Sequence, residues 1–147
     1  MFWKQVLYTA LFFVGSFILA AIIENIFVDI NSGMIVLGVN NLLELLLFSL
    51  STIIFPAIVE ETFFRKNLIC FANKKILVTT TLSSMLLYSL EHALTISGIL
   101  LCMIWALPLS LSYIKTKNIY VPMTAHFICN FIMNGFSVII ALQSGII

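Results

Sequence analysis

Long apolar runs separated by short polar stretches are the dominant pattern of this chain. Five runs can be marked, with approximate bounds Val6–Ile23, Leu42–Val59, Ile76–Leu90, Ala93–Ile114 and from Ile119 towards the C-terminus. An 18-residue helix reaches about 27 Å, close to the thickness of the hydrocarbon core of a bilayer. The pattern predicts an all-α fold: a polytopic transmembrane helix bundle of about five spans, forming one integral-membrane domain over residues 1–147. The first run is too long for the apolar part of a signal peptide, so we expect it to be retained.

The composition supports a membrane location. Of the 147 residues, 62% are hydrophobic and only 9% are charged, whereas soluble domains carry about 25% charged residues. Too few polar side chains remain to cover a surface that faces water. The net charge of +1 gives no indication of nucleic-acid binding. The scattered cysteines, Cys70, Cys102 and Cys129, show neither the spacing of a disulfide framework nor that of a zinc site.

The basic residues predict the orientation in the membrane. All of them precede the first run, lie between the second and third, or lie between the fourth and fifth: Lys4, Arg65, Lys66, Lys74, Lys75, Lys115 and Lys117. Basic loops stay on the cytoplasmic side, so the N-terminus and these loops are expected in the cytoplasm. The small body, composed almost wholly of membrane segments, suggests a prokaryotic plasma membrane.

Ionisable and amide side chains within the apolar runs need a reason, because such groups are costly at membrane depth. Glu44 has a structural one, since "NLLE" matches a capping box with Asn41 as the N-cap. A second set is harder to explain by capping. It comprises Glu60, Glu61, Arg65, Glu91, His92, His126 and Asn130.

The stretch "EETFFR" at residues 60–65 divides into two parts on a helix. Glu61 and Arg65 are four residues apart, on one face and in the order that favours an ion pair. Glu60 is rotated by about 100° from Glu61, so no partner on its own helix neutralises it. Pro56, one turn earlier, predicts a kink because it cannot donate to the carbonyl of Thr52. The alternative is that both glutamates simply end the helix at the cytoplasmic interface.

The two histidines suggest hydrolytic chemistry. His126 and Asn130 are also four residues apart and could both donate hydrogen bonds to one developing oxyanion. His92 could hold a water together with Glu60, which is a general-base arrangement for hydrolysis. Two alternatives remain open: each histidine is a satisfied residue of a helix interface, or the acid–histidine set carries protons or ions.

Three motifs in this order resemble the CPBP family of intramembrane endopeptidases, the CAAX-protease and bacteriocin-processing (Abi-type) proteins. They are "EETFFR" (60–65), "YSLEH" (88–92) and "HFICN" (126–130), within a core of about residues 55–135. The resemblance implies that Glu60 activates a water, that His92 orients it, and that His126 and Asn130 form the oxyanion hole. It implies supporting roles for Glu61 and Arg65. It also implies no cofactor: zinc at Glu60, His92 and His126 is disfavoured because no H-E-x-x-H helix is present.

The chain departs from the family pattern in three respects. Tyr88 stands where the family usually has phenylalanine, Glu91 stands where a small residue is typical, and the chain is shorter than most members. A straight third helix starting at Lys75 would also carry His92 about 25 Å from the cytoplasmic end, too far from Glu60. We therefore expect the loop before this helix to dip, or the helix to be tilted and to start outside the bilayer, so that one water can bridge the two side chains.

The leading functional prediction is an intramembrane protease that cuts a peptide or membrane-protein substrate in the lipid bilayer. The first alternative is a non-catalytic immunity or binding protein of the same fold, and the second is an ion or proton carrier. The sequence leaves open whether the chain forms an oligomer or needs a partner subunit.

Overall fold

Five helices make up the protein in the computed structural model, which describes residues 1–26, 33, 34 and 39–143. Their bounds are Phe2–Ile26 (α1), Leu42–Asn67, Lys74–Leu90 (α4), Ile96–Thr116 (α5) and Tyr120–Gln143 (α6). The continuous helix Leu42–Asn67, called the long helix below, contains α2 (Leu42–Ser49), η1 (Leu50–Ile54), α3 (Phe55–Glu60) and η2 (Glu61–Asn67). No β-strand occurs in the described ranges, which hold an isolated bridge between Met34 and Ala93.

The all-α membrane fold predicted from the apolar runs is confirmed. Four helices are long and apolar enough to cross a membrane: α1, the long helix, α5 and α6. The third predicted span is shorter than these four helices. It corresponds to α4, which has 17 residues and is directly preceded and followed by polar residues. The long helix extends past Val59 to Asn67, so "EETFFR" lies wholly within it and two further helical residues follow Arg65.

Side-chain caps fix where several helices begin. Asn41, Asn73 and Thr95 each accept a hydrogen bond from the backbone N–H three residues later. The Asn41 cap was predicted, but the reciprocal half of the capping box differs. The Glu44 carboxylate accepts from the backbone N–H of Asn40 at 2.7 Å and from the side-chain amide of Asn41 at 2.9 Å. Because Thr95 caps α5, that helix begins three residues later than the apolar run suggested.

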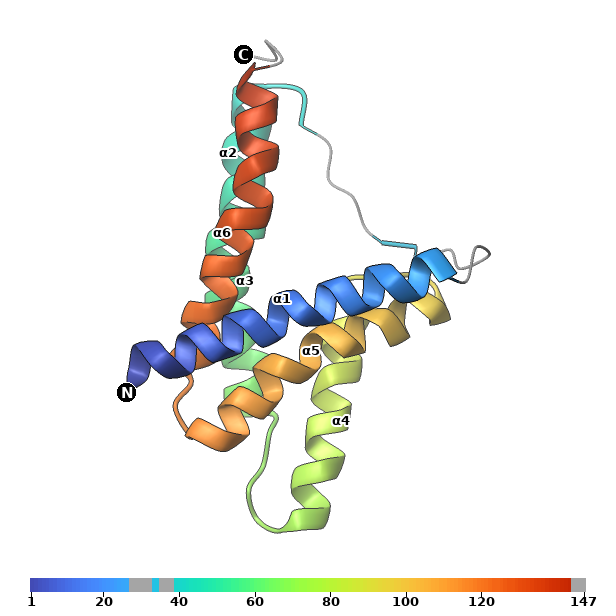
Figure 1. The fold of residues 1–147 in the computed structure, drawn as a ribbon, viewed down its shortest axis with the longest axis vertical. Helices are drawn as coiled ribbons and strands as arrows, with labels where there is room; N and C mark the ends of the chain where they lie inside the picture. Colours follow the sequence, from blue (N-terminus) through green and yellow to red (C-terminus); the bar gives the residue numbers. More distant parts are fainter. Residues whose placement is uncertain (27–32, 35–38, 144–147) are drawn as a thin grey trace.

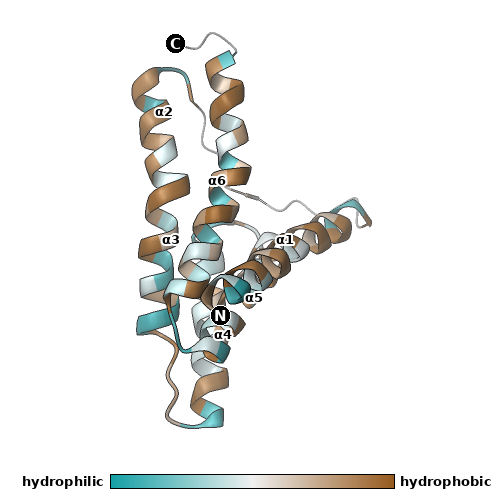
Figure 2. Cartoon of the chain, turned by 60° about the vertical axis from the view of Figure 1, so that its left-hand side comes forward, coloured by the Kyte–Doolittle hydropathy of each residue, from teal (hydrophilic) through white to brown (hydrophobic). Residues whose placement is uncertain are grey.

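The helices form two groups that cross one another (Figure 1). The long helix and α6 run antiparallel and side by side, and α1 packs against both α5 and α6. Below them, α4 packs against α5 and η2. Figure 2 shows apolar residues over most of the helix surfaces and hydrophilic ones at the end of η2 and the start of α4. This distribution suits helices whose outer faces contact lipid.

Two stretches of the long helix have π geometry, in which each hydrogen bond spans five residues. In η1 the N–H of Phe55 donates to the carbonyl of Leu50, immediately before Pro56. The disturbance expected from Pro56 is thus a widened turn on its N-terminal side. The second stretch, η2, begins at Glu61 and carries Arg65. Such segments occur frequently at functional sites.

The position of α4 brings His92 close to the other motifs. Ser84 donates a hydrogen bond to the carbonyl of Phe64 at 2.6 Å, and the N–H of Cys70 donates to the hydroxyl of Thr80 at 3.1 Å. The chain therefore runs beyond the end of the long helix before α4 begins and returns alongside it (Figure 1). The chain therefore does not form the straight hairpin that would leave His92 far from Glu60. Instead, α4 starts beyond the end of η2 and runs back past it.

Candidate active site

A cavity of about 690 Å³ lies between the long helix and α6 on one side and α1, α5 and the end of α4 on the other. The four predicted catalytic residues, Glu60, His92, His126 and Asn130, all line it. The remaining lining residues are Phe13, Phe17, Val39, Leu45, Phe48, Ser51, Thr52, Pro56, Tyr88, Glu91, Trp105, Met133, Asn134, Ser137 and Ala141. Three motifs far apart in the sequence thus meet at one cavity, although their chemical roles remain predictions.

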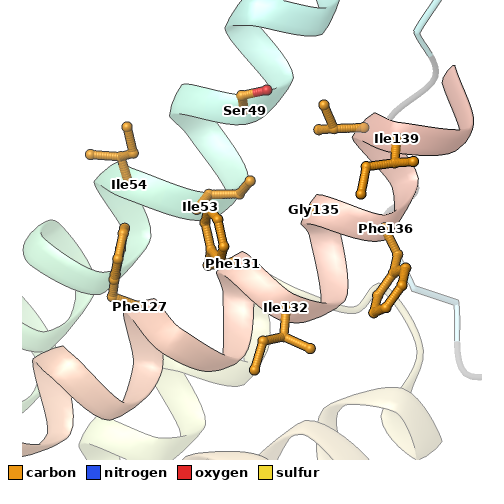
Figure 3. A pocket seen from close by; sticks show the side chains of 10 residues that line it. Ser49, Ile53, Ile54, Phe127, Phe131, Ile132, Gly135, Phe136 and Ile139 are labelled. Atoms are coloured by element: carbon orange, nitrogen blue, oxygen red, sulfur yellow. The ribbon is translucent and has the colours of Figure 1, made fainter. Parts of the chain in front are cut away.

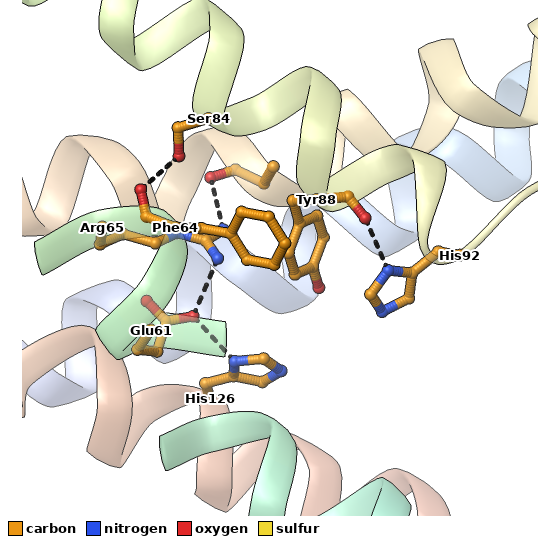
Figure 4. A network of polar contacts seen from close by, with 8 residues as sticks. Glu61, Phe64, Arg65, Ser84, Tyr88, His92 and His126 are labelled. Carbon is orange, nitrogen blue, oxygen red and sulfur yellow. Dashed lines mark hydrogen bonds and ion pairs between the residues drawn. The ribbon is translucent and has the colours of Figure 1, made fainter. Parts of the chain in front are cut away.

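Glu61 and Arg65 form the ion pair that their spacing predicted. The Arg65 Nη1 and Glu61 Oε1 atoms are 3.2 Å apart, and both side chains are fully buried. The guanidinium also donates from Nη2 to the carbonyl of Ala106 at 3.4 Å and lies over the Tyr88 ring, 4.5 Å from its centroid. Arg65 therefore joins η2 to α4 and α5 (Figure 4). Neither charge could remain here alone, because burial without a partner is strongly unfavourable.

His126 is held by the same carboxylate. Its Nδ1 lies 2.9 Å from Glu61 Oε1, and the side chain is almost fully buried. An ionised carboxylate can only accept, so Nδ1 carries the proton. The other ring nitrogen points away from Glu61 (Figure 4). Phe13 of α1 packs edge-on against the imidazole at 5.5 Å. The sequence did not indicate this bond between the first and third motifs.

His92 is oriented by Tyr88, four residues earlier in its own motif. Its Nδ1 lies 2.9 Å from the Tyr88 carbonyl, and the two rings stack with centroids 4.4 Å apart. Because a carbonyl oxygen can only accept, Nδ1 again carries the proton. In the neutral imidazole Nε2 is then an acceptor. Both histidines of the cavity therefore use Nδ1 to hold position and leave Nε2 available.

Glu60 differs from its neighbour Glu61. It lines the cavity and forms no ion pair with a described residue, whereas Glu61 contacts Arg65 and His126. The Oε2 atom of each glutamate is covered and has no hydrogen-bond partner. The turn after α4 brings a second carboxylate, Glu91, to the same cavity. Burial raises the pKa of Glu91, the charge of Glu60 raises it further, and His92 opposes both effects. The two carboxylates are therefore close enough to influence one another.

Asn134 is a residue of the site that the sequence analysis missed. It lines the cavity, and its side-chain amide donates to the carbonyl of Thr52 at 3.0 Å. The available signal was its spacing, since Asn134 follows Asn130 by four residues and so continues the polar stripe of α6.

A second cavity, of about 610 Å³, is lined by the neighbouring stripe of α6 and has no ionisable side chain (Figure 3). Phe127 and Phe131 directly follow His126 and Asn130, so they project about 100° further around the helix. The lining residues are Ser49, Ile53, Ile54, Phe127, Phe131, Ile132, Gly135, Phe136, Val138 and Ile139. The polar chemistry of α6 is therefore confined to the first cavity.

Comparison with protein families gives a match over residues 42–132 to the model described as "Type II CAAX prenyl endopeptidase Rce1-like". The match covers more than half of the chain and contains all three motifs. The chain belongs to the Rce1-like family. This confirms the resemblance to CPBP proteins, of which the Rce1-like family is part. No curated protein and no solved structure matched the chain. Membership of this protease family and the apolar helices together indicate an integral-membrane protein of the protease type.

Proposed function

We propose that this Rce1-like protein is an intramembrane endopeptidase in which Glu60 activates a water for attack on a peptide bond. The observation that carries the proposal is the difference between the two adjacent glutamates. Glu61 is neutralised by Arg65 behind the cavity wall. Glu60 forms no ion pair with a described residue and lines the cavity beside His92, His126 and Asn130. A carboxylate in this setting suits general-base chemistry.

The first step transfers a proton from water to Glu60. The Nε2 of His92 accepts a hydrogen bond from the same water and so orients it, because Nδ1 of His92 is occupied by the Tyr88 carbonyl. The water oxygen then bonds to the substrate carbonyl carbon, and the carbonyl oxygen gains the negative charge. Glu60 next gives its proton to the amide nitrogen, the C–N bond breaks, and a carboxylic acid and an amine leave.

Asn130 and His126 stabilise the oxyanion of that intermediate. The amide of Asn130 donates directly. Nε2 of His126 donates only when the imidazole carries a second proton, since Nδ1 already donates to Glu61. The Glu61 carboxylate holds the ring in this orientation through the bond to Nδ1, as a buried acid does for the histidine of a catalytic triad. Glu61 thereby supports the site without contacting the substrate.

We propose that this chemistry uses no metal and that the basic loops face the cytoplasm. In the part of the chain that the structure describes, no three His, Cys, Asp or Glu side chains are grouped to hold an ion. The substrate is a peptide or a membrane protein that reaches the cavity within the bilayer. Maturation of peptides, immunity to bacteriocins and processing of prenylated proteins are the roles that the family suggests.

Product mass spectrometry on a peptide library, with the protein in liposomes, tests this function. The wild type should release defined fragments, and Glu60→Gln should lower the rate by about 10²- to 10⁴-fold, the usual contribution of a general base. Glu44→Gln is the matched control, because this glutamate lies at the exposed start of the same helix. A Glu60→Gln protein that cuts at the wild-type rate contradicts the mechanism. Peptide or toxin binding without cleavage would favour an immunity protein, and ion flux would favour a carrier.

A further inference from the structure

The carbonyl of Thr52 occupies a special position in the wall of the cavity. Thr52 lies in η1, just before the π turn passes into α3. Pro56 has no N–H, so it cannot give the Thr52 carbonyl the hydrogen bond that an α-helical turn would supply. The side-chain amide of Asn134, on the neighbouring α6, donates to this carbonyl at 3.0 Å. A carbonyl without this α-helical donor is costly to leave unsatisfied in an apolar environment. The contact is therefore worth more than a surface hydrogen bond.

This contact is one of two that set how α6 lies against the long helix. The first joins Asn134 to Thr52, and the second joins His126 to Glu61. Between them α6 advances eight residues and the long helix nine. The additional residue falls in a stretch that begins within the π turn of η1. Both contacts must hold for the two helices to stay in this register.

The proposed catalytic groups lie between these two contacts. Glu60 is one turn after Pro56, and Asn130 is one turn before Asn134. A slip at the Thr52 end would move Glu60 relative to Asn130 even if the bond between His126 and Glu61 remained. An error of about 1 Å in such a geometry can cost about 10² in rate.

We propose that Asn134 is a positioning residue, which substitutes for the hydrogen bond that Pro56 removes and thereby aligns Glu60 with Asn130. This inference rests on the proposed proteolytic function. Asn134 acts through the Thr52 carbonyl and contacts no reacting atom. Its loss should therefore lower kcat by about 10- to 100-fold and leave KM nearly unchanged, because the groups that line the rest of the cavity remain.

A double-mutant cycle between Asn134→Ala and Pro56→Ala tests the inference. Alanine at position 56 restores a backbone N–H that can donate to the Thr52 carbonyl, so Asn134 becomes dispensable. The kcat loss caused by Asn134→Ala should be several-fold smaller in the Pro56→Ala background. Asn25→Ala is the matched control, because Asn25 donates to a backbone carbonyl of its own helix at an exposed position. It should leave kcat unchanged.

The unfolding midpoints of the same four proteins in detergent provide a second readout. They should show the same coupling, since the contact stabilises the fold as well as the site. Equal kcat losses in both backgrounds, or a loss confined to KM, would overturn the positioning role. If the wild type cuts no peptide while Glu60→Gln is equally silent, the proteolytic function fails and the positioning role fails with it. The midpoints then still decide whether Asn134 and Pro56 are coupled.

Discussion

Glu60 and Glu61 are consecutive residues in opposite environments. Glu61 is fully buried, shares one oxygen between Arg65 and His126, and connects the first motif to the third. Glu60 lines the cavity and forms no ion pair with a described residue. One step along a helix therefore separates a carboxylate that stabilises the fold from one that is available for chemistry.

Under the proposed mechanism, the difference shows how a membrane protein can hold a reactive acid. Charges at this depth are tolerated when they are paired. Glu61 and Arg65 neutralise one another, and Arg65 also contacts α4 and α5. These contacts hold in place the wall of the cavity that carries Glu60. The three predictions below are ordered by expected size. The first tests the buried Glu61–Arg65 pair, and the other two test residues of the cavity.

The largest effect is expected for Arg65→Met. Removal of the guanidinium leaves the Glu61 carboxylate buried beside His126 without its cation, which should cost about 3–5 kcal/mol in the free energy of unfolding. Equilibrium unfolding in mixed detergent measures this loss. Lys66→Met is the control, since Lys66 is the next residue and is exposed. The double variant Glu61→Gln/Arg65→Met should regain part of the stability. Equal midpoints for Arg65→Met and Lys66→Met would refute a buried, mutually required pair.

Asn130→Ala should have the next largest effect, on the cavity side. Loss of one oxyanion donor lowers kcat by about 10²- to 10³-fold. KM should change little, because the donor acts on the transition state and not on the bound substrate. Steady-state kinetics on a cleaved peptide separates the two parameters. A raised KM with an unchanged kcat would assign Asn130 to substrate binding instead.

The smallest effect is expected for Glu91→Gln. Burial and the charge of Glu60 raise the pKa of Glu91, so Glu91 gains its negative charge at a higher pH than an exposed glutamate does, beside the proposed reacting groups. Glu91→Gln removes that change of charge, so the acidic limb of the kcat/KM profile should become less steep. An unaltered profile would show that Glu91 does not act on the reacting groups.

The helices and the first ion pair were predictable because they depend on local sequence. The apolar runs located all five helices, and the four-residue spacing of Glu61 and Arg65 was sufficient to predict their contact. The family resemblance rested on three short motifs and is confirmed by the match over residues 42–132. The pattern was imprecise about where helices begin and end. Asn73 and Thr95 set the starts of α4 and α5 by side-chain caps, and the long helix continues from Val59 to Asn67.

The contacts between motifs were not predictable from spacing. The bond from His126 to Glu61 joins residues 65 positions apart, and nothing in either motif specifies it. The π turns of the long helix have no pattern of their own beyond Pro56. The return of α4 depends on where the loop before it runs, and Ser84 fixes that only through its bond to Phe64. Asn134 was overlooked because its role appears only once Pro56 is seen to free the Thr52 carbonyl.

The most direct test of the account is the cleavage rate of Glu60→Gln, measured beside Glu61→Gln in preparations whose unfolding midpoints are also recorded. We predict that Glu60→Gln keeps the wild-type midpoint and loses about 10²-fold or more in rate. Glu61→Gln should unfold more easily, since it leaves Arg65 without its carboxylate. A Glu60→Gln protein that is fully folded and cuts its substrate at the wild-type rate would contradict the central claim.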